Sequence, residues 1–440
     1  MKGLTVRFAV LLFFTVFYSL SIHFAHTGYL AEQHHAPFFN YGNLDFFEFV
    51  IILLFISVSL FFLPLRIASV SSIFVVVLYY FLYLPIFVIS LGNDRLPVDE
   101  LSFVLLVVTA SFFIVSMPSR FIANSALVDE RFLKRVSNIF FVLWGCALVF
   151  FLLEFGGVMG FVGLDSIYIQ RELGRAETAF AGYLQLYFGY FLSLAVFAFG
   201  LHFRKFIFLA VGVLGCFLLY LVTAERSIFV LPAFVFVVYL AVLSKNNFTF
   251  WLSAFLCLSS LSFLCVGLYY NESKVVYEIG FYYLVRVVAI PGVLFEQYYE
   301  FFSKVGYTNF SHVSVLNLLL DPDRYFIGDP LYPQLGKIVA RDVYNINSNL
   351  NSSFMATDGV AAFGLIGLLI VSLVFSIYLF LVDFLGRNWP LTFIVPAMCP
   401  LAIVLTNGSL FTVLLSFGGL AWLMILAVTN VIFTLKRKQI

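Results

Sequence analysis

The 440-residue chain is 63% hydrophobic and 20% aromatic, only 11% of its residues are charged, and its formal net charge at pH 7 is +1. A soluble domain is typically about a quarter charged, so the composition excludes a water-soluble globular protein and predicts an all-α protein that crosses a membrane many times. The near-zero net charge gives no basis for a nucleic-acid partner.

A helix needs about 20 apolar residues to cross a bilayer. Twelve apolar runs meet this description, at 4–22, 44–64, 67–91, 101–118, 138–155, 180–201, 206–223, 227–243, 248–270, 357–382, 391–408 and 411–434. The connections between them are short except for one polar segment. We therefore expect nine membrane helices in residues 1–270, a large loop at 271–356, and three further helices with a short tail in 357–440.

The distribution of Lys and Arg predicts the orientation of these spans, because short cytoplasmic loops are enriched in positive charge. One set of sides carries fourteen Lys and Arg, whereas the short loops of the opposite set carry only Arg95, Arg171, Arg175 and Arg226. Both termini are therefore expected in the cytoplasm, and the large loop on the outer side.

An isolated pair of charges, Glu225 and Arg226, lies between the seventh and eighth predicted spans, in an otherwise uncharged stretch from 206 to 243. An arginine at bilayer depth costs about 2.5–3.5 kcal/mol even on lenient scales, which predicts that the pair lies in a turn at the outer membrane face. Two interpretations remain. The charges neutralise each other at a tight hairpin, or the arginine holds an anionic lipid headgroup.

A second outward segment, at 165–182, carries Arg171 and Arg175. On a helix, side chains four residues apart share a face, and two guanidinium groups there would suit a phosphate or diphosphate. The alternative is a short interfacial helix whose arginines are neutralised by Glu172 and Glu177.

The large loop has two parts. Residues 277–302 are aromatic-rich and contain Arg286, which predicts amphipathic helices that lie on or re-enter the membrane. Residues 312–353 contain charged, tyrosine and amide side chains that suit carbohydrate binding, or that simply solvate an outer domain. The candidates there are His312, Arg324, Arg341, Asn349 and Asn351. The pair of aspartates in "DPD" (321–323) reads as a turn rather than a metal site, and no metal or other cofactor is expected.

Three stretches together resemble the bacterial O-antigen polymerase (Wzy) family. They are "TAERSIFVLP" (223–232), similar to a Thr-x-x-Arg-(Ser/Gly) hairpin, "RELGRAETAFAG" (171–182), similar to an Arg-x10-Gly pattern, and "NSSFMATDGVAAFGLIGLLI" (351–370), similar to the re-entry after the large loop. The chain departs from the related O-antigen ligases in lacking their His-Asn before the re-entry helix, where it has Asn349 and Asn351. Arg324 and Gly336 miss a second Arg-x10-Gly by one residue.

The resemblance implies a GT-C-like or O-antigen ligase-like architecture in a bacterial inner membrane, with a periplasmic large loop. It implies glycosyl transfer between undecaprenyl-diphosphate-linked oligosaccharide units, with membrane lipids and a chain-length regulator protein as further partners. Fixed arginines would stabilise the diphosphate. Arg226 and Arg171 are the first candidates, followed by the substrate-binding candidates Arg175, Arg286, Arg324, Arg341, Asn349 and Asn351.

A base for the acceptor hydroxyl requires a titratable group within hydrogen-bonding reach. His312, Asp358 and Glu225 are the candidates, and the sequence does not choose between them. Two other functions remain open, a lipid-linked oligosaccharide flippase or other transporter, and an O-antigen ligase. A transporter should show ionisable residues deep in several spans or two matched halves, whereas here the polar residues gather on one side.

Overall fold

The computed structural model describes residues 2–32, 38–39, 46–92, 97–122, 128–161, 167–176, 178–244, 247–314 and 316–437. Four residues used in the sequence analysis lie outside the described residues. They are Arg95, Lys245 and Lys438, which were counted for the orientation of the spans, and Glu177, a predicted partner of Arg171 and Arg175. Within these ranges all regular secondary structure is helical, as predicted.

In chain order, the described α-helices are α1 (Lys2–Ala25), α2 (Phe46–Leu60), α3 (Val70–Leu78), α4 (Leu84–Gly92), α5 (Val98–Ser116), α6 (Pro118–Phe121), α7 (Glu130–Phe155), α8 (Ile167–Leu173), α9 (Ala179–Leu186), α10 (Leu194–Phe203), α11 (Phe206–Thr223), α12 (Arg226–Leu243), α13 (Phe248–Tyr269), α14 (Lys274–Ile279), α15 (Ile290–Val305), α16 (Leu335–Tyr344), α17 (Ala361–Gly386), α18 (Leu391–Val404), α19 (Leu410–Ser416) and α20 (Gly419–Arg437). The π-helical segments are η1 (His26–Leu30), η2 (Tyr79–Tyr83), η5 (Tyr187–Ser193), η7 (Gly280–Ala289) and η9 (Met355–Val360), and short 3₁₀ turns are η3 (Gly156–Val158) and η8 (Arg324–Phe326).

Among the described residues, ten helices are long and apolar enough to cross a membrane, so the chain is a multi-pass membrane protein. Nine of them overlap predicted spans, and the tenth is Lys274–Val305, inside the predicted large loop. Two predicted spans correspond to the shorter helices α2 and α18, and the last predicted span is the pair α19–α20, which is bent by 58°.

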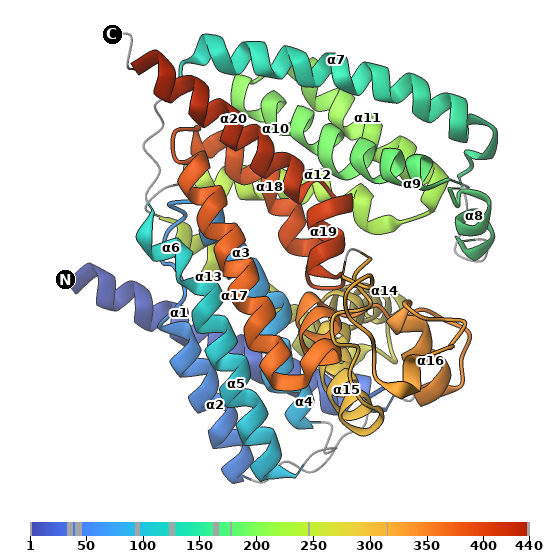
Figure 1. Ribbon diagram of the computed structural model, residues 1–440. Helices are drawn as coiled ribbons and strands as arrows, with labels where there is room; N and C mark the ends of the chain where they lie inside the picture. The colour runs from blue at the N-terminus through green and yellow to red at the C-terminus, as the bar shows by residue number, and fades with distance from the viewer. Residues whose placement is uncertain are drawn as a thin grey trace.

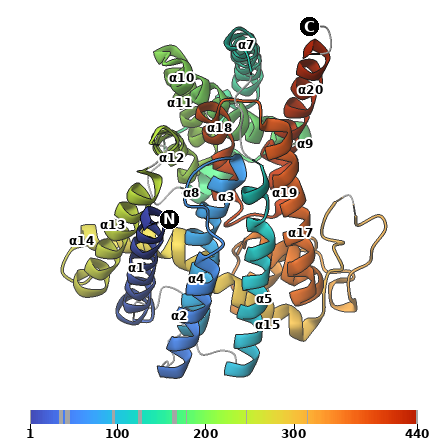
Figure 2. The same cartoon turned by 90° about the vertical axis from the view of Figure 1, so that its left-hand side faces the viewer.

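The helices form two groups that are joined by α18. Helices α7, α10, α11 and α12 lie at the top of Figure 1, and α1 to α5 lie below them, as Figure 2 also shows. Helix α18 packs against α10 and α12 of the first group and α3 of the second. Both termini lie on the left of Figure 1, whereas α8 and α16 lie on the right. We call the end of the molecule that carries α8 and α16 the loop side. It is formed by the 223–227 turn, α8 and residues 271–353.

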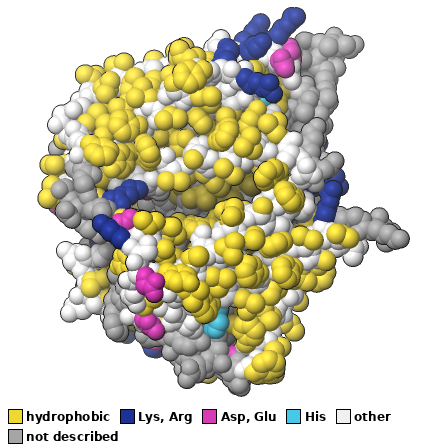
Figure 3. Space-filling model, turned by 180° about the vertical axis from the view of Figure 1, so that it is seen from behind, with side chains coloured by type: hydrophobic (Ala, Val, Ile, Leu, Met, Phe, Trp, Pro, Cys, Tyr) yellow, Lys and Arg dark blue, Asp and Glu magenta, His cyan; other side chains and the backbone are white. Residues whose placement is uncertain are grey.

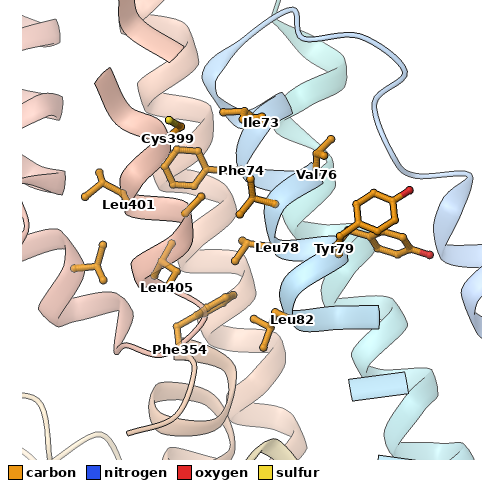
Figure 4. Close-up of a cluster of buried hydrophobic side chains, with 14 of the residues drawn as sticks. Ile73, Phe74, Val76, Leu78, Tyr79, Leu82, Phe354, Cys399, Leu401 and Leu405 are labelled. Atoms are coloured by element: carbon orange, nitrogen blue, oxygen red, sulfur yellow. The ribbon is translucent and has the colours of Figure 1, made fainter. Parts of the chain in front are cut away.

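The core of the second group is a cluster of apolar side chains at the junction of α3, α18 and the chain before α17 (Figure 4). Every residue of α3 is buried, because this helix is surrounded by protein rather than lipid. Phe74, Leu78, Phe354 and Leu405 are each at most 1% exposed. By contrast, apolar side chains cover most of the face seen in Figure 3, and its charged side chains gather at the upper right, at the right edge and in a band on the left. This is the surface expected for a protein in contact with lipid.

The predicted span at 357–382 is interrupted. Gly364 has φ +59° and ψ −140°, which breaks the helix between Phe363 and Gly364, and only glycine adopts such a conformation readily. The chain folds back there, since the Phe354 and Phe375 rings lie 5.2 Å apart. A Cβ on Gly367 would lie 2.2 Å from the Gly359 carbonyl oxygen. Residues 354–362 therefore form a short half-helix that runs antiparallel to the part of α17 that follows Gly364.

The helix at 274–305 begins and ends on the loop side. Near its start, the Tyr270 hydroxyl donates to Glu32 at 2.7 Å, and near its end the Tyr299 hydroxyl donates to Glu100 at 3.0 Å. Glu32 follows the C-terminal end of the first span, and Glu100 lies in the first turn of α5. In its middle, the Tyr283 hydroxyl lies 2.6 Å from Ser259, halfway along α13. The middle of the segment thus contacts the middle of α13, and the segment is also long and apolar enough to cross a membrane.

Candidate functional site

A pocket of about 630 Å³ opens on the loop side. Its walls come from η5, the 223–227 turn, α15, the 312–314 and 333–336 segments, residues 349–357, and the chain from 403 to 417. Two of the contributing elements, η5 and η9, are π-helical, and such segments often occur at functional sites. The pocket thus gathers residues that are far apart in sequence, and its volume is typical of small-molecule sites.

The 223–227 turn contributes Glu225 to this pocket. Helix α11 ends at Thr223, Ala224 adopts a left-handed conformation with φ +49°, and α12 begins at Arg226. Glu225 accepts a hydrogen bond of 3.0 Å from the Ser227 hydroxyl, and both residues line the pocket. The Glu225 side chain also lies beside Tyr190.

Arg226 turns away from Glu225. Its guanidinium donates to the Tyr282 hydroxyl at 2.8 Å and lies over the Tyr282 ring, 5.3 Å from the centroid. No ion pair between Glu225 and Arg226 forms in this structure, since each has other partners. Of the two interpretations of this charge pair, the self-neutralised hairpin is therefore wrong.

Arg171 and Arg175 lie near the same turn but do not share a helix face. Helix α8 ends at Leu173, so Arg175 lies beyond it and the predicted four-residue helical spacing is wrong. The reason is the close approach of Gly174 to the Val222 carbonyl, where a Cβ would lie 2.0 Å from the oxygen. Gln170 donates to the Leu221 carbonyl at 2.9 Å and so holds α8 against the end of α11. Both arginines are exposed.

His312 and Asp358 form a buried pair at the pocket wall. Their side chains are 5% and 0% exposed, and His312 Nε2 lies 3.4 Å from Asp358 Oδ1. His312 Nδ1 lies 2.7 Å from the Thr308 hydroxyl. Asp358 also accepts from the Ser409 hydroxyl at 2.8 Å and from the Leu410 backbone N–H. Asp358 therefore ties the half-helix at 354–362 to the 308–312 segment and to the start of α19.

The remaining arginine candidates have other surroundings. Arg341 pairs with Asp329 at 2.6 Å and with Asp342 at 2.5 Å. Hydrogen bonds from Arg341 hold the pKa of both carboxyl groups below their ordinary value, and the pKa of Arg341 is raised by the same bonds. Arg286 and Arg324 are exposed, and Arg286 lies over the Phe281 ring at 5.1 Å.

The structure therefore separates the predicted site residues. Glu225, His312, Asn349 and Asn351 line the pocket, and Asp358 reaches it through His312 and Ser409. The six arginines lie outside the pocket's described lining: Arg171, Arg175, Arg226, Arg286, Arg324 and Arg341. Arg226 is the nearest to it in sequence, because both of its neighbours line the pocket.

Sequence reasoning missed several lining residues. Tyr190 and Tyr298 lie in aromatic-rich apolar segments, and nothing in their local sequence distinguishes them from the tyrosines around them. Ser352 lies in the polar run at 347–353, beside the candidate Asn351, but was not singled out. Asn407 and Ser409 had a visible signal, since the polar run "TNGS" (406–409) interrupts two apolar runs on the predicted outer side.

The described lining combines hydroxyl, amide and aromatic groups with one carboxylate, Glu225, and one imidazole, His312. Among the described residues, no group of three or more His, Cys, Asp or Glu side chains is arranged to hold a metal ion. Such a lining can bind a hydroxyl-rich ligand and accept a proton from it. Comparison of the chain with protein-family models, curated proteins and solved structures found no match.

Proposed function

We propose that this protein is a membrane glycosyltransferase that polymerises undecaprenyl-diphosphate-linked oligosaccharide repeat units at the periplasmic face of a bacterial inner membrane. The resemblance of three short stretches to the O-antigen polymerase family supports the substrate class. The shape and chemistry of the pocket support a reaction on the loop side.

The observation that carries the proposal is the division of the 225–227 turn. Glu225 and Ser227 line the pocket, while Arg226 between them contacts Tyr282 outside it. Two consecutive residues thus direct a carboxylate into the pocket and a guanidinium away from it. Glycosyl transfer from a lipid diphosphate needs both groups, a base for the acceptor hydroxyl and a cation for the leaving diphosphate.

In the proposed reaction, an acceptor hydroxyl oxygen attacks the anomeric carbon of the donor glycan. The bond between that carbon and the phosphate oxygen breaks, and undecaprenyl diphosphate leaves with the bonding electrons. The hydroxyl proton passes to the Glu225 carboxylate. Arg226 neutralises the charge that develops on the diphosphate, and Arg171 and Arg175 add positive charge at the same corner of the loop side.

Glu225 is the best placed of the three candidate bases. The Asp358 carboxylate is fully buried, and its oxygens already have Ser409, Leu410 and His312 as partners. Both nitrogens of His312 face other side chains. Glu225 is only partly buried and lines the pocket. We assign His312 and Asp358 as positioning residues that hold the pocket wall together.

The test is chain growth by the purified full-length protein on synthetic undecaprenyl-diphosphate-linked units. We expect long glycans with the native protein. Glu225→Gln should lower the rate about 10²–10⁴-fold, the usual contribution of a general base, and Arg226→Ala should lower it comparably to the loss of one oxyanion donor, about 10²–10³-fold. Lys304→Ala is the matched control, because its exposed side chain pairs with Glu300 on the same helix and is not among the described residues that line the pocket.

Retained chain growth in both Glu225→Gln and Arg226→Ala would contradict the assignment of these residues. The two other functions are separated in cells that lack the gene. Lipid A core that carries a single repeat unit indicates a polymerase, whereas core without any repeat unit indicates a ligase or a flippase. A ligase and a flippase are then distinguished by transport of lipid-linked units in liposomes, which only a flippase carries out.

A further inference from the structure

The pocket contains an unsatisfied polar group at its inner wall. Ser352 is 1% exposed and lines the pocket, and its hydroxyl has no hydrogen-bond partner in the structure. A buried hydroxyl without a partner costs free energy, and a ligand that donates or accepts a hydrogen bond would remove this cost. The feature points to a bound molecule that carries polar groups deep into the pocket.

The other described lining groups indicate which polar groups these are. Amides come from Gln334, Asn349, Asn351 and Asn407. Hydroxyls come from serine and threonine residues of the 225–227, 352–357 and 409–416 segments, and aromatic faces are supplied by tyrosines and phenylalanines, among them Tyr190 and Phe417. Amides and hydroxyls bond sugar hydroxyls in either direction, as donors or acceptors.

The charge of the pocket indicates which ligands it disfavours. Its described lining has the Glu225 carboxylate and no Lys or Arg. The arginines nearby are engaged elsewhere, Arg226 with Tyr282 and Arg341 with Asp329 and Asp342. His312 directs its two nitrogens to Thr308 and Asp358. An anionic ligand would therefore lose hydration in the pocket, gain no cation, and face a like charge.

We infer that the pocket binds the non-reducing terminal sugar of the acceptor unit, and that this sugar is uncharged. The inference rests on the proposed function and specifies its substrate class. Units that end in a neutral hexose or an N-acetylated hexosamine are accepted. Units that end in a uronic acid, a sialic acid or a phosphorylated sugar are rejected.

The test compares two synthetic lipid-linked units that differ only at the terminal sugar, glucose in one and glucuronic acid in the other. This pair changes a hydroxymethyl group into a carboxylate and leaves the rest of the ring unchanged. With the native protein, we expect chain growth on the glucuronate unit to be at least about tenfold slower, since like charges a few ångströms apart at a partly buried site repel by more than the roughly 1.4 kcal/mol that a tenfold change represents.

A charge substitution in the pocket sharpens the test. Gln334 is exposed, lines the pocket and uses only its backbone for hydrogen bonds in the structure. Gln334→Arg adds a cation there and should reduce the difference between the two units severalfold. The control is Asn347→Arg, at an exposed position two residues from Asn349 but outside the pocket lining, which should leave the difference unchanged.

A second measurement separates this inference from the proposed function. Binding of the free glucose- and glucuronate-terminated oligosaccharides to the detergent-solubilised protein is followed by saturation-transfer NMR. Chain growth on both units at equal rates, or equal binding of both, would overturn the inference. If neither unit supports chain growth but the glucose-terminated oligosaccharide still binds preferentially, the proposed polymerase function is refuted. The inferred preference of the pocket for an uncharged sugar then still holds.

Discussion

Two buried aspartates lie at opposite ends of the same chain segment, Asp358 in η9 and Asp383 near the end of α17. Each accepts hydrogen bonds from a backbone N–H and a serine hydroxyl at the start of another helix. For Asp358 the donors are Leu410 N–H and the Ser409 hydroxyl before α19, and for Asp383 both donors belong to Ser71 in α3. The local chemistry is the same at both ends.

The surroundings of the two carboxylates differ. Asp383 is 3% exposed, among serines and apolar side chains on the side of the molecule away from the pocket. Asp358 additionally meets His312, which lines the pocket. A carboxylate buried in a membrane helix is thus not in itself evidence of a transport or catalytic role, because one that caps a neighbouring helix is accounted for by structure. Its contact with a pocket distinguishes Asp358.

The largest expected difference between the two is in activity. Asp358→Asn keeps the volume but weakens the hold on His312 and α19, and a displacement of about 1 Å in a site costs on the order of 10²-fold in rate. We expect such a loss in chain growth per folded molecule, and no loss for Asp383→Asn. Equal rates of chain growth in Asp358→Asn and Asp383→Asn would show that the two aspartates do not differ in their effect on activity.

The next effect is on stability. Asp383→Ala removes the acceptor for the start of α3 and leaves buried donors unsatisfied, which should lower the free energy of unfolding by about 2–3 kcal/mol. Thermal unfolding in detergent measures the loss, and chain growth below the new Tm should stay at the native rate. A variant that is as stable as the native protein would show that Ser71 does not depend on Asp383.

A matched pair of serine substitutions gives a smaller effect. Ser409→Ala and Ser71→Ala each remove one hydroxyl donor to a buried carboxylate, and each should cost about 1 kcal/mol of stability. Only Ser409→Ala should also slow chain growth, by a few-fold, because its partner carboxylate positions the pocket wall. A rate change of similar size in Ser71→Ala would show that the two ends of the segment are coupled.

The smallest expected effect comes from Asp329 and Asp342, the two carboxylates of the large loop that pair with Arg341. Arg341 lowers the pKa of Asp329 and Asp342 below the ordinary value near 3.8. Their contribution to stability is therefore complete above about pH 5, and it is lost as the pH falls through the lowered pKa values. Because Arg341 is 40% exposed, solvent screening keeps the effect below about 1 kcal/mol. Arg341→Met should flatten the acid limb of a stability-versus-pH profile, and an unchanged limb would contradict this.

The sequence alone determined whether most segments lie within the membrane or at its surface. Apolar runs separated by charged turns predicted a multi-pass helical protein, because a bilayer admits backbone only where its hydrogen bonds are satisfied within the segment. The same reasoning placed Glu225 and Arg226 in a turn and gathered the candidate residues on one side. It also predicted helices at 277–302, where the structure has η7 and α15.

Only the tertiary structure decided which residues meet. Hydropathy reports depth along the membrane normal, but it carries no information on which helices lie side by side. The opposite directions of Glu225 and Arg226, the end of α8 at Leu173 and the break at Gly364 each depend on contacts with distant segments. The pocket joins residues from Tyr183 to Phe417. Its assembly follows from side-chain packing between helices, which no local pattern in this sequence expresses.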